Sequence, residues 1–175
     1  INSDGLASLQ RVPQLRRNHQ YWLAQLLRDL SKSSVSSVQL AERKIGDEEL
    51  ILITDVLEES SPIIRTFWLS GECLSPRSLV PFFQRAMGES SKIVRLYLKN
   101  TKYGDDVARV LSSSLRHNTS LEVLSLMDSS LSAKGASAIA EGLVDNSTLR
   151  RLNLDRNQIG DVGLSVLGQV IPKSA

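Results

Sequence analysis

At 175 residues and 41% hydrophobic content, the chain has the size and composition of one elongated domain with a core. It has no apolar run near the length of a membrane span and no apolar targeting stretch at its start, so we expect no membrane span. The formal net charge is only +2, and the single cysteine, Cys73, excludes an internal disulfide. One thiol favours a reducing compartment, so we expect an intracellular protein, in the cytoplasm or inside an organelle, rather than a secreted one.

The first expected element is a helix over residues 15–30, within a separate N-terminal segment, residues 1–33. The residues at the spacing of one helical face are Leu15, His19, Trp22, Leu23, Leu26, Leu27 and Leu30. A small polar break follows at Ser31 to Ser37. We expect the helix to cover the open end of the next element, with Trp22 in the core and Tyr21 at the surface. The alternative is that it forms the helical half of a degenerate repeat.

Within residues 34–175 one pattern returns five times. Its first apolar position is held by Val35, Ile64, Ile93, Leu121 and Leu149, which are 29, 29, 28 and 28 residues apart. The last two units are the clearest, and the first two are degenerate. Because a period of this length is typical of stacked repeats, we expect units at about 35–63, 64–92, 93–120, 121–148 and 149–171.

Each unit is expected to contain a strand and a helix. In Leu124-Ser125-Leu126 the apolar residues alternate, as in a strand with one buried face. From Gly135 to Leu143 they follow the spacing of one helical face. One unit cannot bury its apolar face alone, so neighbouring units must stack, and their common phase predicts parallel strands.

The pattern L-x-x-L-x-L-x-x-N-x-L, best seen from Leu149 to Ile159, resembles the ribonuclease-inhibitor type of leucine-rich repeat. The resemblance covers roughly residues 34–171. It implies an α/β solenoid, with an arc of short parallel strands on the concave face and helices on the convex face, but no particular function. Only Asn157 keeps the asparagine that follows the strand; the other four positions hold Arg43, Glu72, Thr101 and Ser129. A continuous asparagine ladder is therefore not expected.

Two asparagines, Asn118 and Asn146, begin N-glycosylation sequons, and both stand just after an expected helix. We interpret them as structural residues, as left-handed terminators of those helices.

Cys73 is interpreted as a small buried residue rather than a nucleophile, because no histidine lies near it in the repeat. Phe82 and Phe83 are expected to pack the second repeat's helix.

The small net charge conceals blocks of charge. Residues 1–44 carry seven basic and three acidic groups, residues 45–62 carry six acidic groups and no basic one, and residues 65–102 carry seven basic and two acidic groups. We interpret the acidic block as a solvated face of the first repeat's helix. The alternative concerns the basic segment 92–102, with Arg95, Lys99 and Lys102, which could attract an acidic protein or RNA, although no nucleic-acid motif is recognised.

If the leucines of each strand point inward, the residues between them face the inner surface of the arc. The central row is expected to be Gln39, Trp68, Tyr97, Ser125 and Asn153. The rows on its two sides are expected to be Ser37, Thr66, Arg95, Val123 and Arg151, and Ala41, Ser70, Lys99, Met127 and Asp155. Because Trp, Tyr and Arg often dominate interface energy, we predict a partner-binding site formed by Trp68, Tyr97, Arg95, Lys99, Met127, Arg151 and Asn153. The alternatives are that Trp68 and Tyr97 only stack on each other, or that the register slips and Trp68 turns inward.

No arrangement typical of catalysis stands out. His19 and His117 have no evident partners, and no phosphate-binding or nucleophile motif is present, so we expect no enzyme activity, cofactor, metal or small-molecule substrate. We predict a protein–protein interaction module or scaffold subunit of a multi-subunit assembly, binding through the concave face or through the uncapped last repeat. There Leu164, Leu167 and Ile171 are expected to stay uncovered. The alternatives are a regulator of a small GTPase, of the Ran GTPase-activating type, and the recognition domain of a longer receptor.

Overall fold

The computed structural model describes residues 17–31, 35–41, 43, 45–60, 63–70, 73–101 and 103–170. Three positions discussed above, Glu72, Lys102 and Ile171, lie outside the described residues, and so does the side chain of His19. Residues 15 and 16, where the N-terminal helix is expected to start, also lie outside them.

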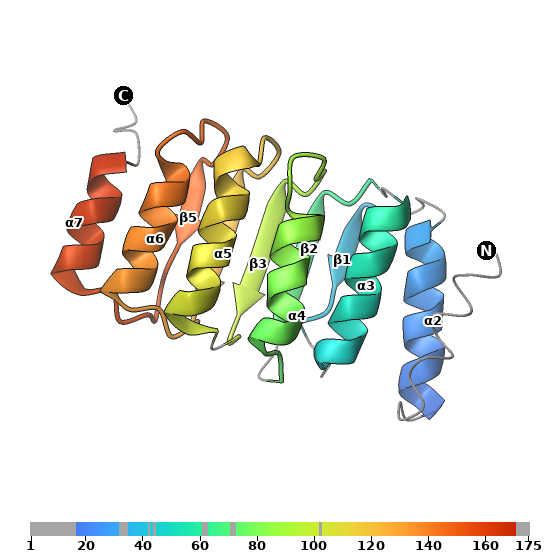
Figure 1. Cartoon of the computed structure of the whole chain (residues 1–175). Helices are drawn as coiled ribbons and strands as arrows, with labels where there is room; N and C mark the ends of the chain where they lie inside the picture. The colour runs from blue at the N-terminus through green and yellow to red at the C-terminus, as the bar shows by residue number, and fades with distance from the viewer. Residues whose placement is uncertain are drawn as a thin grey trace.

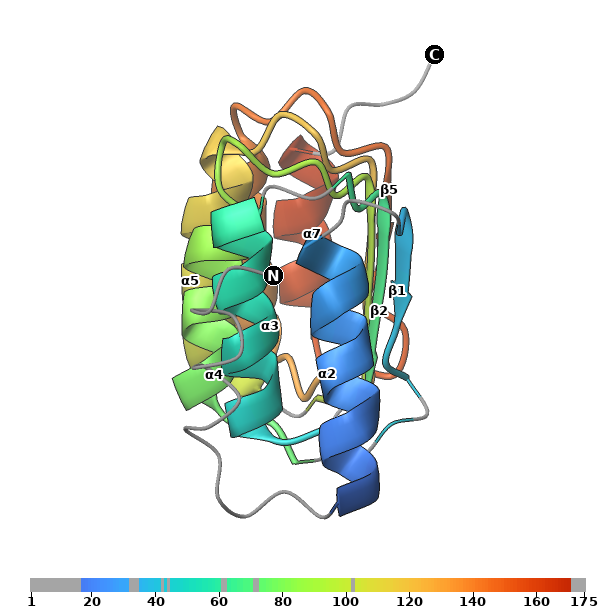
Figure 2. The same cartoon turned by 90° about the vertical axis from the view of Figure 1, so that its right-hand side faces the viewer.

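The described chain alternates strands and helices in two layers (Figures 1 and 2). The strands are β1 (Ser37–Gln39), β2 (Thr66–Ser70), β3 (Arg95–Lys99), β4 (Val123–Met127) and β5 (Arg151–Asn153), and they form one parallel sheet in chain order. The helices α3 (Asp47–Ser60), α4 (Pro76–Pro81), α5 (Gly104–His117), α6 (Ala133–Leu143) and α7 (Gly160–Val170) lie in a row on one face of that sheet. The expected α/β solenoid is therefore confirmed.

The hydrophobic core lies between the two layers. Each strand sends alternate residues into it, so that Leu96 and Leu98 of β3 are 0% exposed while the residues on either side of them are not buried. The helices supply the opposite wall through one apolar face, which in α5 consists of Val107, Ala108, Leu111 and Leu115. The residues between the inward leucines are consequently left for the outer surface of the sheet.

Helix α2 (Arg17–Ser31) stands beside α3 at the β1 end of the solenoid (Figures 1 and 2). Its three inward leucines, Leu23, Leu27 and Leu30, are buried, so the helix covers apolar surface at this end. Tyr21 is exposed, as expected. The expectation that Trp22 lies in the core is only partly right, because its ring packs against the core but stays partly exposed beneath the Arg43 guanidinium, 4.8 Å from the ring centroid.

The helix of the second repeat changes its hydrogen-bonding pattern after Pro81 and continues as a π-helical segment, η1 (Phe82–Ala86). Phe82 and Phe83 are both 0% exposed, as expected of residues that pack this helix. The Phe82 ring lies 5.2 Å from that of Phe67 in β2, and the Phe83 ring lies 6.3 Å from that of Tyr103. The two phenylalanines thus pack the helix on its own strand and on the next repeat.

Asn118 and Asn146 join neighbouring repeats after helices α5 and α6. Oδ1 of Asn118 accepts hydrogen bonds from the backbone N–H groups of Ser120 and Leu121, and Nδ2 donates one to the carbonyl of Met87 in the preceding repeat. Asn146 makes the equivalent bonds one repeat later, with Thr148, Leu149, Leu115 and Asn118. The structural role expected for both asparagines is confirmed. The prediction that both adopt a left-handed backbone conformation is wrong, because Asn118 has φ −79° and ψ 125°, and Asn146 has no positive φ.

The asparagine position after the strand is also linked from repeat to repeat. Asn157 accepts hydrogen bonds from the N–H groups of Ser129 and Leu131 and donates one to the carbonyl of Leu126. One repeat earlier the Ser129 hydroxyl lies 3.4 Å from the hydroxyl of Thr101. Thr101 and Ser129 are both buried. Short polar side chains therefore occupy, in these two repeats, the position after the strand that asparagine holds in the last repeat.

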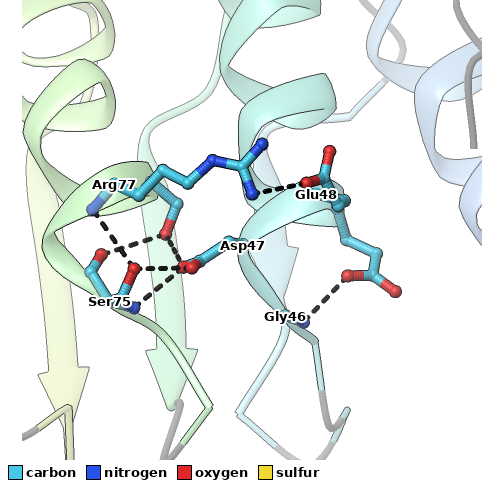
Figure 3. Close-up of polar contacts among 7 residues, drawn as sticks. Gly46, Asp47, Glu48, Ser75 and Arg77 are labelled. Atoms are coloured by element: carbon cyan, nitrogen blue, oxygen red, sulfur yellow. Dashed lines mark hydrogen bonds and ion pairs between the residues drawn. The ribbon is translucent and has the colours of Figure 1, made fainter.

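A further set of bonds links the starts of helices in neighbouring repeats (Figure 3). Asp47 of α3 accepts hydrogen bonds from the backbone N–H of Ser75 at 2.8 Å and from the Ser78 hydroxyl at 2.6 Å. The Ser75 hydroxyl also donates to Asp47, and it accepts the N–H of Arg77, which caps the start of α4. Asp105 of α5 makes the same contacts with the backbone and hydroxyl of Ser132.

These bonds determine the charge state of the two aspartates. Burial alone would raise the pKa of Asp47 and of Asp105. The hydrogen bonds from the serine hydroxyl and backbone groups of the next repeat outweigh burial and hold both pKa values below their ordinary value of 3.8. Both carboxylates are therefore ionised parts of the repeat-to-repeat contact at neutral pH.

The expectation that Cys73 is buried is wrong, because this free thiol is exposed. Cys73 lies in a turn after β2, where the alternation of the strand no longer decides which side chains point inward.

Candidate binding surface on the sheet

The strand register gathers the predicted binding residues on the sheet face that points away from the helices (Figure 2). In the central row, the Cα partners run from Gln39 to Trp68, Tyr97, Ser125 and Asn153. Phe67 is 0% exposed and its neighbour Trp68 is only partly buried, so the register has not slipped. The predicted central row is confirmed.

The two side rows are confirmed within the strands. One row pairs Ser37, Thr66, Arg95, Val123 and Arg151, and the other pairs Ser70, Lys99 and Met127. Ala41 and Asp155, the expected ends of the second row, lie in turns beyond β1 and β5. Thr66 is buried, although its row was expected to face solvent.

We call the seven predicted binding residues the sheet-face patch: Trp68, Arg95, Tyr97, Lys99, Met127, Arg151 and Asn153. Its centre lies on β2 and β3, where Trp68 and Tyr97 are direct neighbours and Arg95 and Lys99 flank Tyr97. Arg151 and Asn153 lie two strands away from β3, roughly 10 Å by the usual strand spacing. The register therefore brings the aromatic and basic residues of β2 and β3 together and leaves those of β5 at the rim.

Trp68 and Tyr97 form a stacked pair, with ring centroids 5.3 Å apart and planes inclined by 8°. Both rings remain partly exposed. An aromatic pair of this kind is worth about 1 kcal/mol beyond its buried area. Stacking, raised above as an alternative to binding, is therefore present and also holds the two rings in a defined orientation at the surface.

The basic side chains of the patch have no partners within the described chain. Arg95, Lys99 and Arg151 are exposed, and their side chains make no hydrogen bond or ion pair with a described residue. They are the only charged residues among the outward-facing positions of the five strands, and Asp155 follows in the turn after β5. The patch is consequently a positively charged surface around two aromatic rings.

The acidic block of residues 45–62 has partners in the next repeat. Arg85 of η1 contacts Asp55 at 2.7 Å and Glu58, and hydrogen bonds to Glu58 raise the pKa of Arg85. Arg77 of α4 contacts Glu48 at 2.7 Å (Figure 3). Glu48, Glu58 and Glu59 are exposed, as expected of a solvated helix face, but Glu49 is buried and accepts the backbone N–H of Gly46, so the expectation is only partly right. The charge pattern of the sequence alone did not reveal the pairing with basic residues of the following repeat.

The last repeat leaves apolar side chains uncovered, although the set differs from the expected one. Leu164 is 57% exposed, as expected, whereas Leu167 is 3% exposed and belongs to the core. Val162, which the sequence reading did not include, is 68% exposed. A hollow of about 270 Å³ lies in this repeat, lined by the apolar Leu143, Leu149, Leu152 and Val170 together with Asn146, Arg150 and Arg151. No contact in the structure indicates what covers this end.

Among the described residues, no group of three or more His, Cys, Asp or Glu could hold a metal ion. No described helix is long and apolar enough to cross a membrane. The sheet-face patch itself presents two partly exposed aromatic rings and unpaired positive charge among the described residues.

A family model described as leucine-rich repeat matches residues 117–140 and 145–168, which include β4 and β5. Ribonuclease inhibitor from Sus scrofa is 28% identical over 142 residues, which are 80% of this chain and 31% of that protein. NACHT, LRR and PYD domains-containing protein 3 is 28% identical over 135 residues in Bos taurus and 27% identical over 143 residues in Homo sapiens. This chain covers 13% of each of those two proteins, so it spans less than a third of the length of these relatives.

Proposed function

Because this chain is a leucine-rich-repeat protein related to ribonuclease inhibitor, we propose that it is a non-catalytic protein-binding module whose partner lies on the sheet-face patch. A solenoid presents equivalent positions of successive repeats side by side, which suits an extended contact with another protein. The outward-facing rows of the parallel sheet are such positions.

The Trp68–Tyr97 stack is the observation that carries this proposal. Trp and Tyr are common among residues that dominate binding energy, because they bury large areas and lose little conformational entropy. The core does not need either ring, since Phe67, Leu96 and Leu98 of the same strands fill it. A partly exposed aromatic pair that the core does not require is best explained by contact with a partner.

We further propose that the module works inside the cell, as a scaffold subunit of a larger assembly. An exposed free thiol at Cys73 suits a reducing compartment. The side-chain amide nitrogens of Asn118 and Asn146 donate hydrogen bonds to carbonyl groups of the preceding repeat, and a glycan on either nitrogen would interfere with those bonds. Both observations favour an intracellular site over a secreted one.

The recognition region of a longer receptor is the second candidate. It is favoured by the relatives whose names include NACHT and PYD domains alongside leucine-rich repeats. The reading frame of the native transcript tests it, since this candidate requires a nucleotide-binding domain in the same chain.

Affinity capture from the native source, followed by amine-directed cross-linking and mass spectrometry, tests the binding proposal. Lys99 lies within the sheet-face patch, whereas Lys134 lies at the start of α6 on the opposite side of the molecule, and both are exposed. We expect the partner to be linked to Lys99. Links to Lys134 without any to Lys99 would place the contact on the helix side and reject the patch as the binding site.

A further inference from the structure

We propose, on the basis of the function proposed above, that the partner presents an acidic polypeptide segment to the sheet-face patch. In this arrangement an apolar side chain of the segment lies against the Trp68–Tyr97 stack, and its carboxylates lie toward Arg95 and Lys99. Arg151 extends the same positive charge to the β5 rim.

Charge complementarity is the first reason. Arg95 and Lys99 point outward from the same strand, on either side of Tyr97, and neither has an acidic partner within the described chain. They are four positions apart in the strand, which corresponds to roughly 13 Å, a span that an extended segment covers with about four residues of its own. A carboxylate-bearing segment therefore gains two new ion pairs without breaking any ion pair between described residues.

The acidic residues that are bonded on the helix layer do not supply these carboxylates. On the helix side, Asp55 and Glu58 are engaged by Arg85, and Glu48 by Arg77. Asp47 and Asp105 are held by serines of the next repeat. These acids lie on the helix layer, away from the outer face of the sheet, so the basic residues of the patch remain available to an external acidic segment.

The aromatic geometry indicates one apolar side chain among the acids. Trp68 and Tyr97 cover each other's facing ring surfaces, because their planes are nearly parallel. On the other side of Tyr97 the central row continues with Ser125, whose small side chain leaves that ring face without a large neighbour in the row. An apolar side chain of the partner can lie over Ser125 against this face of Tyr97.

A polypeptide fits this surface better than a nucleic acid does. Nucleic-acid sites neutralise a run of phosphates with many basic side chains, whereas the strands supply only Arg95, Lys99 and Arg151, on two of the five strands.

Display selection with a library of random short peptides tests the inference, with a random single-stranded RNA pool screened in parallel. The baits are the wild-type chain, Arg95→Glu/Lys99→Glu, Trp68→Ala/Tyr97→Ala and the matched control Arg109→Glu/Arg116→Glu. Arg109 and Arg116 are exposed on α5, so the control changes the net charge equally on the helix side. Circular dichroism checks the fold of each bait, and Arg95→Gln/Lys99→Gln replaces the charge reversal if that variant does not fold.

We expect the wild-type chain to enrich peptides with net negative charge and at least one large apolar residue. Their affinity should fall about tenfold or more in Arg95→Glu/Lys99→Glu, fall with added salt, and stay unchanged in the helix-side control. Enriched peptides that are neutral or basic, yet lost with Trp68→Ala/Tyr97→Ala, would overturn the acidic partner and leave the binding module standing. Equal enrichment on the wild-type and Trp68→Ala/Tyr97→Ala baits would count against the proposed function itself. Enrichment of RNA in place of peptides would also overturn the acidic partner.

Discussion

The two faces of this solenoid differ in whether their charged residues have partners. On the helix side, Arg85 pairs with Asp55 and Glu58 of the preceding repeat, and Asp105 is bonded to the serine that starts the next helix. On the sheet side, Arg95 and Lys99 pair with no described residue. The difference separates polar groups that hold one repeat on another from polar groups that are left for a partner. Substitution of the helix-side groups that join neighbouring repeats should therefore change stability, and substitution of the basic residues on the sheet side should change binding.

The largest loss of stability is expected for Asn118→Ala. The substitution leaves the buried carbonyl of Met87 and the backbone N–H of Leu121 without their partners, and Asn118 itself is 3% exposed. We expect the free energy of unfolding to fall by about 3 kcal/mol, measured by urea denaturation. The neighbouring exposed residue provides the control, since Thr119→Ala should change stability by less than about 0.5 kcal/mol. Equal stabilities for the two variants would refute the structural role of Asn118.

Asp105→Asn should cost about 2 kcal/mol, because it removes the charge that accepts two hydrogen bonds from Ser132. The adjacent Asp106→Asn is the matched comparison. Asp106 is exposed, and among the described residues it pairs only with Arg109 of its own helix, so its replacement should cost less than about 0.5 kcal/mol. Thermal melts of the two variants at neutral pH measure the difference, and a larger loss for Asp106→Asn would contradict the repeat-to-repeat contact.

Acidification should also lower the free energy of unfolding, by less than the Asp105→Asn substitution does. The folded-state pKa values of Asp47 and Asp105 lie below the ordinary value of 3.8, so the folded chain binds these protons less readily than the unfolded chain does. Their stabilisation is complete above the ordinary value and is lost as the pH falls through the folded pKa. The Asp105→Asn variant lacks the stabilisation that the ionised Asp105 carboxylate provides. Between pH 5 and pH 2 its free energy of unfolding should therefore fall less than that of the wild type. Parallel pH profiles of the two proteins would argue against this linkage.

The smallest expected effects distinguish the two faces directly. Arg85→Ala removes contacts with Asp55 and Glu58 at a partly exposed site and should cost about 1 kcal/mol at low salt, and less at high salt. Arg95→Ala removes no partner among the described residues and should leave stability within about 0.5 kcal/mol of the wild type. Urea denaturation at two salt concentrations compares them. A salt-dependent loss for Arg95→Ala would mean that this side chain has a structural partner.

The repeat period was sufficient to predict the sheet and its register. Because each unit starts at an equivalent apolar residue, the alternation places Trp68 beside Tyr97, and the structure has this pair in contact. The alternation did not predict burial correctly at the ends of strands. Thr66 is covered although its row faces outward, and Cys73 is exposed although it was expected to be buried. Burial outside a regular element depends on loop geometry, which the hydrophobic pattern does not encode.

Contacts between repeats could not be predicted from the sequence of one repeat unit alone. Asn118 was identified as structural, but its partners are a carbonyl in the preceding repeat and amides that follow it, and these require an extended backbone instead of a left-handed one. The link from Asp47 to Ser75 spans 28 residues, close to one period. Comparison of each polar residue with residues one period away would have suggested it, whereas local capping rules consider only the same helix.

The affinity of the captured partner for Trp68→Ala/Tyr97→Ala tests the central claim most directly. The two rings stack with each other above a core that other residues fill, so the variant should keep the circular dichroism spectrum of the wild type. We predict that its Kd for the partner rises at least about tenfold, which corresponds to about 1.4 kcal/mol of binding free energy. An unchanged Kd in the folded variant would contradict the claim that this face of the sheet is where the partner binds.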